Sequence, residues 1–365
     1  MEKYSNVNNQ MNIPVDETLP VSTFAQCFNS VTNAYKYYWF WAILDHVTLS
    51  TELFISYSEL SRRMLALAWY PLDYYKLSFG PQDSFIRLVK RISALMTVDN
   101  RPGAAPLFQQ MQKRLPLNDL QVMDAEITET LKRYVIYRFL SPFFPAELRG
   151  QKDAAKNKII ERLTAKSTIV PYKIEAEGIR LSEDWMPYFR RHQFMLLGFM
   201  KWQLLRFLQR NNPNVIGLVE KLEKPDRRDL AFAKRAWELY LGDNPFHCIY
   251  SGKIITLENY SLDHFLPWSF TAHDLLWNLV PTTKSINSIK GNKLPNLDKL
   301  LEPFCCVQYH FHRYHQQQGN KAVQSDYQYL AENLSKRTFI KKLSIELRNH
   351  HRVAESLGFA SLLSF

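Results

Sequence analysis

The chain has 365 residues, of which 46% are hydrophobic and 14% aromatic, so it can bury a substantial core and is not a disordered protein as a whole. Its 46 Lys and Arg residues outnumber its 35 Asp and Glu residues, and the net charge of +11 favours a polyanionic partner. Charge alone does not establish such a partner, because many basic proteins bind no nucleic acid.

The cysteines and the apolar runs indicate a compartment. Cys27, Cys248, Cys305 and Cys306 form no CxxC pair and no regular disulfide framework, which favours a reducing environment. The N-terminus lacks a basic stretch followed by an apolar one, so no signal peptide is predicted. The most apolar run, residues 37–44, is far shorter than the ~20 residues that span a bilayer. We therefore expect a soluble, cytoplasmic protein without a membrane segment.

The first 220 residues are predicted to be mostly helical after a leader. Residues 1–20 are polar and Asn-rich without apolar periodicity, and are expected to be mobile. The aromatic residues at 37–41 are expected in the core rather than on a base-stacking surface. Apolar residues at three- and four-residue steps predict helices, and one alternating stretch predicts a strand pair. The helices are 30–47, 58–69, one from near Asp83, 124–135, 154–163 and 185–210, and the strand pair lies within 170–181.

Residues 221–236 carry six Lys and Arg side chains among three acids. Such a run is typical of a solvated helix face, although its place before the next segment also allows a phosphate-tracking role. The chain has no internal repeat and no Gly-rich phosphate-binding loop, so nothing indicates a nucleotide-driven motor.

The pattern changes between residues 244 and 295. Strands are expected at 246–250 and 260–265, with a tight turn at 251–253 from which Ile254 and Ile255 return. Residues 277–281 then lead to a short helix at 282–289, which Gly291 can end. Further helices are predicted at 300–316, 322–334 and 338–347.

Asp263 and His264 lie side by side at a strand end, which suits the hydrolysis of a phosphodiester. That reaction at neutral pH needs a base for water and a divalent cation for the phosphoryl and leaving oxygens. Adjacent side chains on a strand point to opposite faces, so with a bend near Pro267 one can face a metal and the other the water. Asn287 offers a neutral oxygen, and one carboxylate plus one amide suits Mg²⁺, which keeps most of its waters. His273-Asp274 is an alternative base and partner, but it lies in a loop.

Three motifs resemble the HNH (His-Asn-His) endonucleases: SLDHFLPWS at 261–269, WNLVP at 277–281 and NSIKGNKLP at 287–295. The segment is similar to the Asn-terminated variant found in homing and restriction nucleases and in the HNH domain of RNA-guided CRISPR effectors. The resemblance covers about fifty residues and implies a ββα-metal fold, in which a hairpin and a helix enclose one ion.

The resemblance implies a role for each matching residue. His264 matches the general base, and Asp263 and Asn287 match the metal ligands. Asn278 matches the middle Asn, which braces the loop and helps orient the base. Lys290 matches a basic residue that meets a phosphate. The expected products carry a 5′-phosphate and a 3′-hydroxyl.

The segment departs from many HNH proteins because it lacks the two CxxC knuckles that hold a structural zinc. Cys248 stands alone, with Ser251 where a second Cys would fall, so four thiolate ligands cannot be assembled and no structural zinc is expected. The hairpin must then be held by packing. A second conceivable metal site combines Cys305 and Cys306 with three nearby histidines, but at helical spacing these scatter around the axis. The histidines are His310, His312 and His315.

The sequence thus predicts a mainly α protein with a small ββα-metal nuclease unit. The expected parts are a flexible leader at 1–20, a helical target- or partner-recognition region at 21–220, the nuclease unit at 221–300 and a helical extension packing on it at 301–365. The expected activity is cleavage of double-stranded DNA with Mg²⁺, for which Mn²⁺ can substitute. A loose resemblance of the N-terminal region to bacterial proteins that carry HNH units implies prokaryotic defence, antiviral or restrictive, with a partner protein or a homodimer. An RNA endonuclease and a retired nuclease fold that only binds nucleic acid or protein remain the alternatives.

Overall fold

The computed structural model describes residues 13–29, 31–80, 83–96, 98, 103–224, 229–330 and 334–362. The chain divides into two compact units. The N-terminal unit comprises Met1–Pro213 and Leu222–Lys224, and the C-terminal unit comprises Asn214–Lys221 and Pro225–Phe365.

The N-terminal unit is a helical assembly with one small antiparallel sheet, in the order β1-β3-β2. Its strands are β1 (Phe54–Ser56), β2 (Tyr172–Ile174) and β3 (Gly178–Leu181). Its helices are α1 (Val21–Gln26), α2 (Tyr35–Leu49), α3 (Tyr57–Trp69), α4 (Phe85–Leu95), α5 (Ala104–Arg114), α6 (Leu117–Tyr134), α7 (Pro145–Leu148), α8 (Asp153–Lys166), α9 (Trp185–Arg191) and α10 (Gln193–Asn211), with a π-helical turn at Tyr70–Tyr74 and a 3₁₀ turn at Arg138–Phe143. A further 3₁₀ turn, Val219–Lys221, lies in the C-terminal unit.

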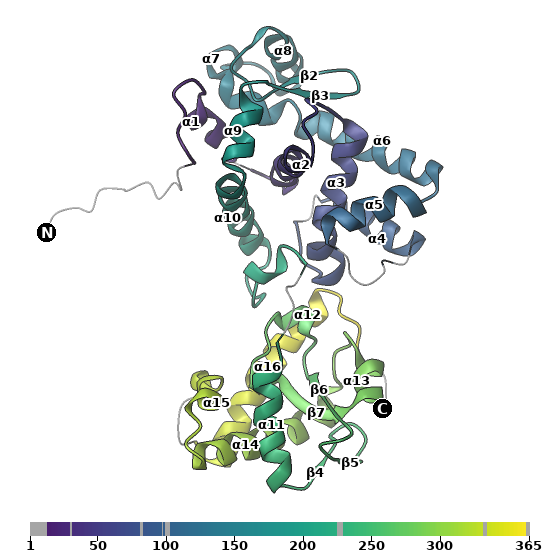
Figure 1. Ribbon diagram of the computed structural model, residues 1–365, viewed down its shortest axis with the longest axis vertical. Coiled ribbons are helices and arrows are strands. Elements are labelled where there is room, and N and C mark those ends of the chain that lie inside the picture. Colours follow the sequence, from purple (N-terminus) through teal and green to yellow (C-terminus); the bar gives the residue numbers. More distant parts are fainter. Residues whose placement is uncertain are drawn as a thin grey trace, which may run out of the picture. The chain divides into compact units, whose positions relative to one another are not determined.

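Helix α2 forms the centre of the N-terminal unit. Its sequence is apolar on all sides, and a helix of this kind is stable only when neighbours cover it completely. Helices α3, α9 and α10 contact it, and they surround it in Figure 1. The aromatic residues at 37–41 are all buried, which confirms that they belong to the core.

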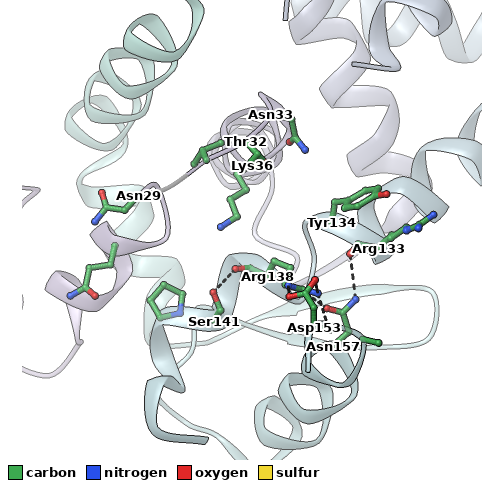
Figure 2. Close-up of a pocket in the computed structure, with 14 residues that line it drawn as sticks. Asn29, Thr32, Asn33, Lys36, Arg133, Tyr134, Arg138, Ser141, Asp153 and Asn157 are labelled. Atoms are coloured by element: carbon green, nitrogen blue, oxygen red, sulfur yellow. Dashed lines mark hydrogen bonds and ion pairs between the residues drawn. The ribbon is translucent and has the colours of Figure 1, made fainter. Parts of the chain in front are cut away.

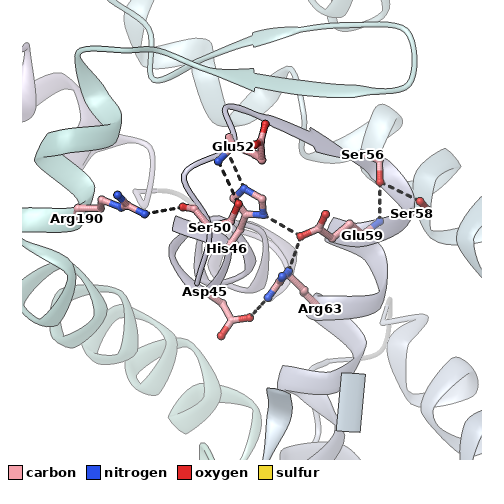
Figure 3. Close-up of polar contacts among 9 residues, drawn as sticks. All are labelled: Asp45, His46, Ser50, Glu52, Ser56, Ser58, Glu59, Arg63 and Arg190. Carbon is pink, nitrogen blue, oxygen red and sulfur yellow. Dashed lines mark hydrogen bonds and ion pairs between the residues drawn. The ribbon is translucent and has the colours of Figure 1, made fainter. Parts of the chain in front are cut away.

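One polar network lies within this core, between α2 and α3 (Figure 3). His46 is buried, and both of its ring nitrogens are bonded: Nδ1 lies 2.8 Å from Oε1 of Glu59 and Nε2 lies 2.9 Å from the carbonyl oxygen of Glu52. The Arg63 guanidinium pairs with both Glu59 and Asp45. A network whose members are all paired stabilises a unique packing, and it leaves no group of His46 for chemistry.

The C-terminal unit contains two small antiparallel sheets, β4-β5 and β6-β7, and a set of helices. The strands are β4 (Phe246–His247), β5 (Ile254–Ile255), β6 (Tyr260–His264) and β7 (Leu279–Thr283). The helices are α11 (Ala231–Asp243), α12 (Trp268–Thr271), α13 (Lys284–Lys290), α14 (Leu297–Gln317), α15 (Lys321–Ser325) and α16 (Lys336–Ser356), with 3₁₀ turns at Leu276–Asn278 and Gln328–Leu330.

Strands β6 and β7 and helix α13 form a ββα unit. His264 pairs with Leu279 and Tyr260 with Thr283, so the register brings the end of β6 beside the start of β7. The Thr283 side chain accepts a hydrogen bond from the Ile286 amide and starts α13, and Gly291, at φ 48°, ends it as predicted. Residues 277–281 were expected to lead straight into a helix at 282–289, and this was wrong for residues 279–283. They form a strand, since each has a pairing partner in β6.

Aromatic stacking and polar contacts join the C-terminal helices to the ββα unit. Phe304 of α14 stacks on Phe265 at 4.0 Å between ring centroids. The Gln308 side chain of α14 donates a hydrogen bond of 2.7 Å to the carbonyl oxygen of Leu279 in β7. Residues 301–365 therefore fall in the same compact unit as the strands that they support.

Most of the predicted helices are present, with different ends. The predicted helix at 322–334 was wrong: its described residues form the short helix α15 and the 3₁₀ turn Gln328–Leu330, and residues 331–333 lie outside the described residues. The long helix at 185–210 breaks at His192 into α9 and α10, and α16 runs nine residues beyond the predicted Leu347. The strand pair at 170–181 is confirmed by β2 and β3. Of the predicted leader, residues 1–12 lie outside the described residues, whereas Pro14 accepts a hydrogen bond of 2.6 Å from the Tyr188 hydroxyl. None of the described helices is long and apolar enough to cross a bilayer.

Candidate active site

His264 is the last residue of β6 and has one ring nitrogen in use. Its Nε2 lies 2.7 Å from Oδ1 of Asp274, in the loop between α12 and β7. Its Nδ1 has no hydrogen bond to any residue that the structure describes. A carboxylate on one ring nitrogen favours the tautomer with the proton there, so Nδ1 keeps its lone pair. This is the arrangement of a general base.

Asp263 lies beside His264 and is almost fully buried. Its Oδ2 accepts a hydrogen bond of 2.6 Å from the Tyr250 hydroxyl, and its Oδ1 lies 3.2 Å from Nζ of Lys290. Burial and the neighbouring carboxylate hold the pKa of Tyr250 well above its usual value, so the phenol keeps its proton and acts as the donor. The two contacts fix the plane of the carboxylate.

Lys290 lies beneath the site rather than on its surface. Its side chain is completely buried, and Nζ also donates a hydrogen bond of 2.5 Å to the carbonyl oxygen of His264. Burial lowers the pKa of Lys290, and the Asp263 carboxylate opposes that shift. The expectation that Lys290 meets a phosphate does not fit this geometry, because its ammonium has no exposed surface. It holds both residues of the Asp263-His264 pair instead.

Asn278 braces the loop that follows β6. Its Oδ1 accepts a hydrogen bond of 2.8 Å from the Leu266 amide, and its Nδ2 donates one of 2.9 Å to the Leu266 carbonyl oxygen. The backbone carbonyl of Asn278 also accepts from the Phe265 amide at 2.8 Å. The side chain is fully buried, so it cannot contact a substrate. Asn278 thus continues the β6–β7 pairing for two residues beyond His264, as the bracing role requires.

Asn287 lies on α13 and is oriented by its amide nitrogen. Nδ2 donates hydrogen bonds of 2.9 Å both to Oγ of Ser261 and to the carbonyl oxygen of Leu262. Its Oδ1 has no hydrogen bond to any described residue, and the side chain is half-buried. The amide is therefore held by its nitrogen to the strand that carries Asp263, with its oxygen left for a ligand.

The oxygen donors of Asp263 and Asn287 suit a hard cation. Among residues 13–29, 31–80, 83–96, 98, 103–224, 229–330 and 334–362, no three His, Cys, Asp or Glu side chains are grouped so that they could hold a metal. This also applies to the alternative set around Cys305 and His310. A carboxylate oxygen has two lone pairs, so Asp263 can accept its two hydrogen bonds and still bind an ion. With the Asn287 oxygen, it supplies the oxygen ligands that Mg²⁺ prefers.

Burial lowers the pKa of two other histidines in this part of the C-terminal unit. His273 directly precedes Asp274 in the chain. Burial lowers the pKa of His273 to about 4, and the neighbouring His264 contributes to this shift. Burial also lowers the pKa of His350, whose ring lies 6.2 Å from that of Trp277. Both shifts favour the neutral imidazole, which leaves the Asp274 carboxylate to pair with His264.

Two residues of the site were not singled out from the sequence for the roles they have here. Asp274 appeared only as a partner for His273, because its distance of ten residues from His264 gives no periodic signal. Tyr250 appeared only as the end of a strand. Tyr250 lies two residues after Cys248, whose Sγ contacts the Thr282 hydroxyl at 3.2 Å.

A carboxylate-held histidine at a strand end, beside a hairpin and a short helix, is typical of a ββα-metal fold. Residues 248–296 match the family model described as HNH endonuclease, and the chain therefore carries a domain of the HNH endonuclease family. No curated protein and no solved structure matches the chain. The match includes every residue of the site described above and none of the N-terminal unit.

Proposed function

We propose that this protein is a divalent-metal-dependent endonuclease that hydrolyses phosphodiester bonds of DNA. The observation that carries the proposal is the bond from His264 Nε2 to Asp274, which leaves Nδ1 without a partner among the described residues. A retired nuclease fold has no need of such a charged orienting partner, and the histidine would be expected to close its second bond as His46 does.

The proposed role of each residue follows from its contacts. His264 accepts a proton from the attacking water at Nδ1, and Asp274 stabilises the imidazolium that forms. Tyr250 and Lys290 hold the Asp263 carboxylate in one orientation, and Asn278 keeps the loop after His264 in place. Each of these three is a positioning residue.

Asp263 and Asn287 would hold the ion, for which we propose Mg²⁺, with Mn²⁺ as a substitute. When bound, a divalent ion offsets negative charge on the phosphoryl and leaving oxygens. Two protein oxygens leave most coordination positions to water and phosphate, as Mg²⁺ prefers.

The net charge of +11 supports a nucleic-acid substrate but does not distinguish DNA from RNA. We propose double-stranded DNA because the sequence resembles homing and restriction nucleases. The same resemblance is the basis for proposing a setting in genome defence. A single ββα site cuts one strand at a time, so a double-strand break would need a homodimer, a partner protein or two successive cuts.

The substrate can be tested by incubating the full chain with Mg²⁺ and end-labelled duplex DNA, duplex RNA and single-stranded RNA of one sequence. We expect cleavage of the DNA duplex, with 5′-phosphate and 3′-hydroxyl ends, and none in EDTA. Cleavage of RNA alone would overturn the proposed substrate while leaving the chemistry intact. No cleavage of any of the three would favour a protein that only binds nucleic acid.

A further inference from the structure

The N-terminal unit contains a polar pocket that takes no part in the nuclease site. Its volume is about 920 Å³, and it is lined by the start of α2 and the loop before it, the end of α6, the 3₁₀ turn at Arg138–Phe143 and the start of α8 (Figure 2). Pockets that bind small molecules have volumes of about 300–1,000 Å³. The size therefore suits a ligand as large as a nucleotide.

Positive charge dominates the described lining. It contains the cations Lys36, Arg133 and Arg138, and Asp153 is its single acid. Arg138 is neutralised, since its guanidinium contacts the Asp153 carboxylate at 2.7 and 2.9 Å. Neither Lys36 nor Arg133 forms an ion pair with a carboxylate in the part of the chain that the structure describes. Two positive charges in the pocket thus lack a counterion.

Lys36 is poorly satisfied for a half-buried cation. Its only hydrogen bond to a described residue reaches the carbonyl oxygen of Cys27 at 3.5 Å, the outer limit for such a bond. In Figure 2 its amine extends from α2 toward the side of the pocket where Arg138 lies. Burial lowers the pKa of Lys36, and the nearby Arg138 lowers it further. A half-buried cation without a counterion lowers the stability of the folded protein, and a bound anion would offset this loss.

The remaining lining can recognise a neutral part of the same ligand. The Tyr134 ring is about half exposed and lies under the Arg133 guanidinium, at 5.2 Å from its centre. Asn29 is exposed, and its side chain has no hydrogen bond to a described residue. A ring for stacking and an amide for hydrogen bonding, next to two cations, match the base and the phosphate of a nucleotide.

We propose that this pocket binds a free, phosphate-bearing small molecule of nucleotide size, with Lys36 and Arg133 contacting the phosphate. The site is separate from the nuclease site, since every residue that lines it belongs to the N-terminal unit. It would give the helical region a ligand of its own.

The test is calorimetric titration of the full chain with adenosine 5′-monophosphate, pyrophosphate and inorganic phosphate, in EDTA so that no ion draws phosphate to the nuclease site. The variants are Lys36→Met and Arg133→Met, with Arg149→Met as the matched control, because Arg149 is exposed and lies outside the pocket. His264→Ala tests independence from the nuclease site. A 5′-phosphorylated oligonucleotide tests whether the phosphate belongs to a strand end instead.

We expect the nucleotide to bind, and each pocket variant to weaken binding by about tenfold or more, as is usual for a lost charge-assisted contact to phosphate. Arg149→Met and His264→Ala should bind as the unchanged protein does. Arg133 is exposed, so its variant will fold even if Lys36→Met does not. The proposal is overturned if none of the three phosphate compounds binds, if both pocket variants bind normally, or if only the oligonucleotide binds.

Discussion

Each unit contains a buried network of charged side chains around a histidine. The two networks differ in whether all of their polar atoms are hydrogen-bonded within the protein. In the N-terminal unit both nitrogens of His46 are bonded, and Arg63 joins Glu59 to Asp45 (Figure 3). In the C-terminal unit Lys290 and Tyr250 hold Asp263, but Nδ1 of His264 and Oδ1 of Asn287 have no partner among the described residues. The first network is complete within the protein. The second network fixes the Asp263 carboxylate and leaves these two atoms available, as a site for water and a metal requires.

The carboxylates that the two cations pair with differ in burial, and this difference gives the largest expected effect. Lys290→Met would leave Asp263 buried without its cation, which costs about 3–5 kcal/mol. Arg63→Met should cost only about 1 kcal/mol, because Glu59 and Asp45 stay partly exposed to water. Urea denaturation of both variants measures this. Equal losses would mean that the two networks are alike.

The second-largest effect is expected from removing the Asn278 hydrogen bonds that hold the loop after β6. Asn278→Leu would leave the amide and carbonyl of Leu266 buried without partners, at a cost of about 1–3 kcal/mol for each unsatisfied group. Cleavage should fall as well, since the loop after His264 loses its anchor. Denaturation and nicking assays on one preparation test both effects. A variant as stable as the parent protein would show that the loop does not depend on this side chain.

Asp274→Ala separates positioning from folding. The carboxylate is partly exposed, so little change in the free energy of unfolding is expected. The kcat of cleavage should fall by about 10–100-fold with KM nearly unchanged, because the base loses its orientation and its charge partner but substrate contacts remain. Steady-state kinetics on a duplex substrate gives both constants. A change confined to KM would place Asp274 in substrate binding instead.

The smallest expected effect is a pH dependence of stability from Lys221, in the C-terminal unit. This side chain is completely buried, and burial lowers its pKa from the usual value of 10.5 to about 7. Between those pH values the unfolded chain binds more protons than the folded one, so the contribution of Lys221 to stability rises with pH. Stability measured at pH 7 and pH 9 should rise more in the parent protein than in Lys221→Met. Equal slopes would contradict the shift.

The sequence predicted the helices and strands better than the connections between them. Apolar periodicity located α2 and α3, because a helix buried on one or more sides repeats its pattern locally. It missed strand β7, since Pro281 interrupts the strand pattern and only pairing with β6 reveals it. The break at His192 has no proline or glycine to mark it.

The same limit applies to the site residues. His264, Asp263 and Asn287 were named from the sequence because they match motifs of the HNH family. The positions of Asp274 and Tyr250 depend on how loops fold back on β6, which no local pattern encodes. Lys290 was expected at a phosphate because it is charged, and its complete burial is a property of the packed unit.

We propose His264 as the base because its Nδ1 has no partner among the described residues, whereas both ring nitrogens of His46 are bonded within the protein. Nicking of supercoiled plasmid in Mg²⁺ by the parent protein, His264→Ala and His46→Ala tests this directly. We predict that the parent protein nicks only when the metal is present. His264→Ala should lose about 10²–10⁴-fold in rate while keeping its stability. His46→Ala should be less stable but still cleave at low temperature. Cleavage that survives His264→Ala, or that needs no metal, would contradict the assignment of His264 as the base in a metal-dependent reaction.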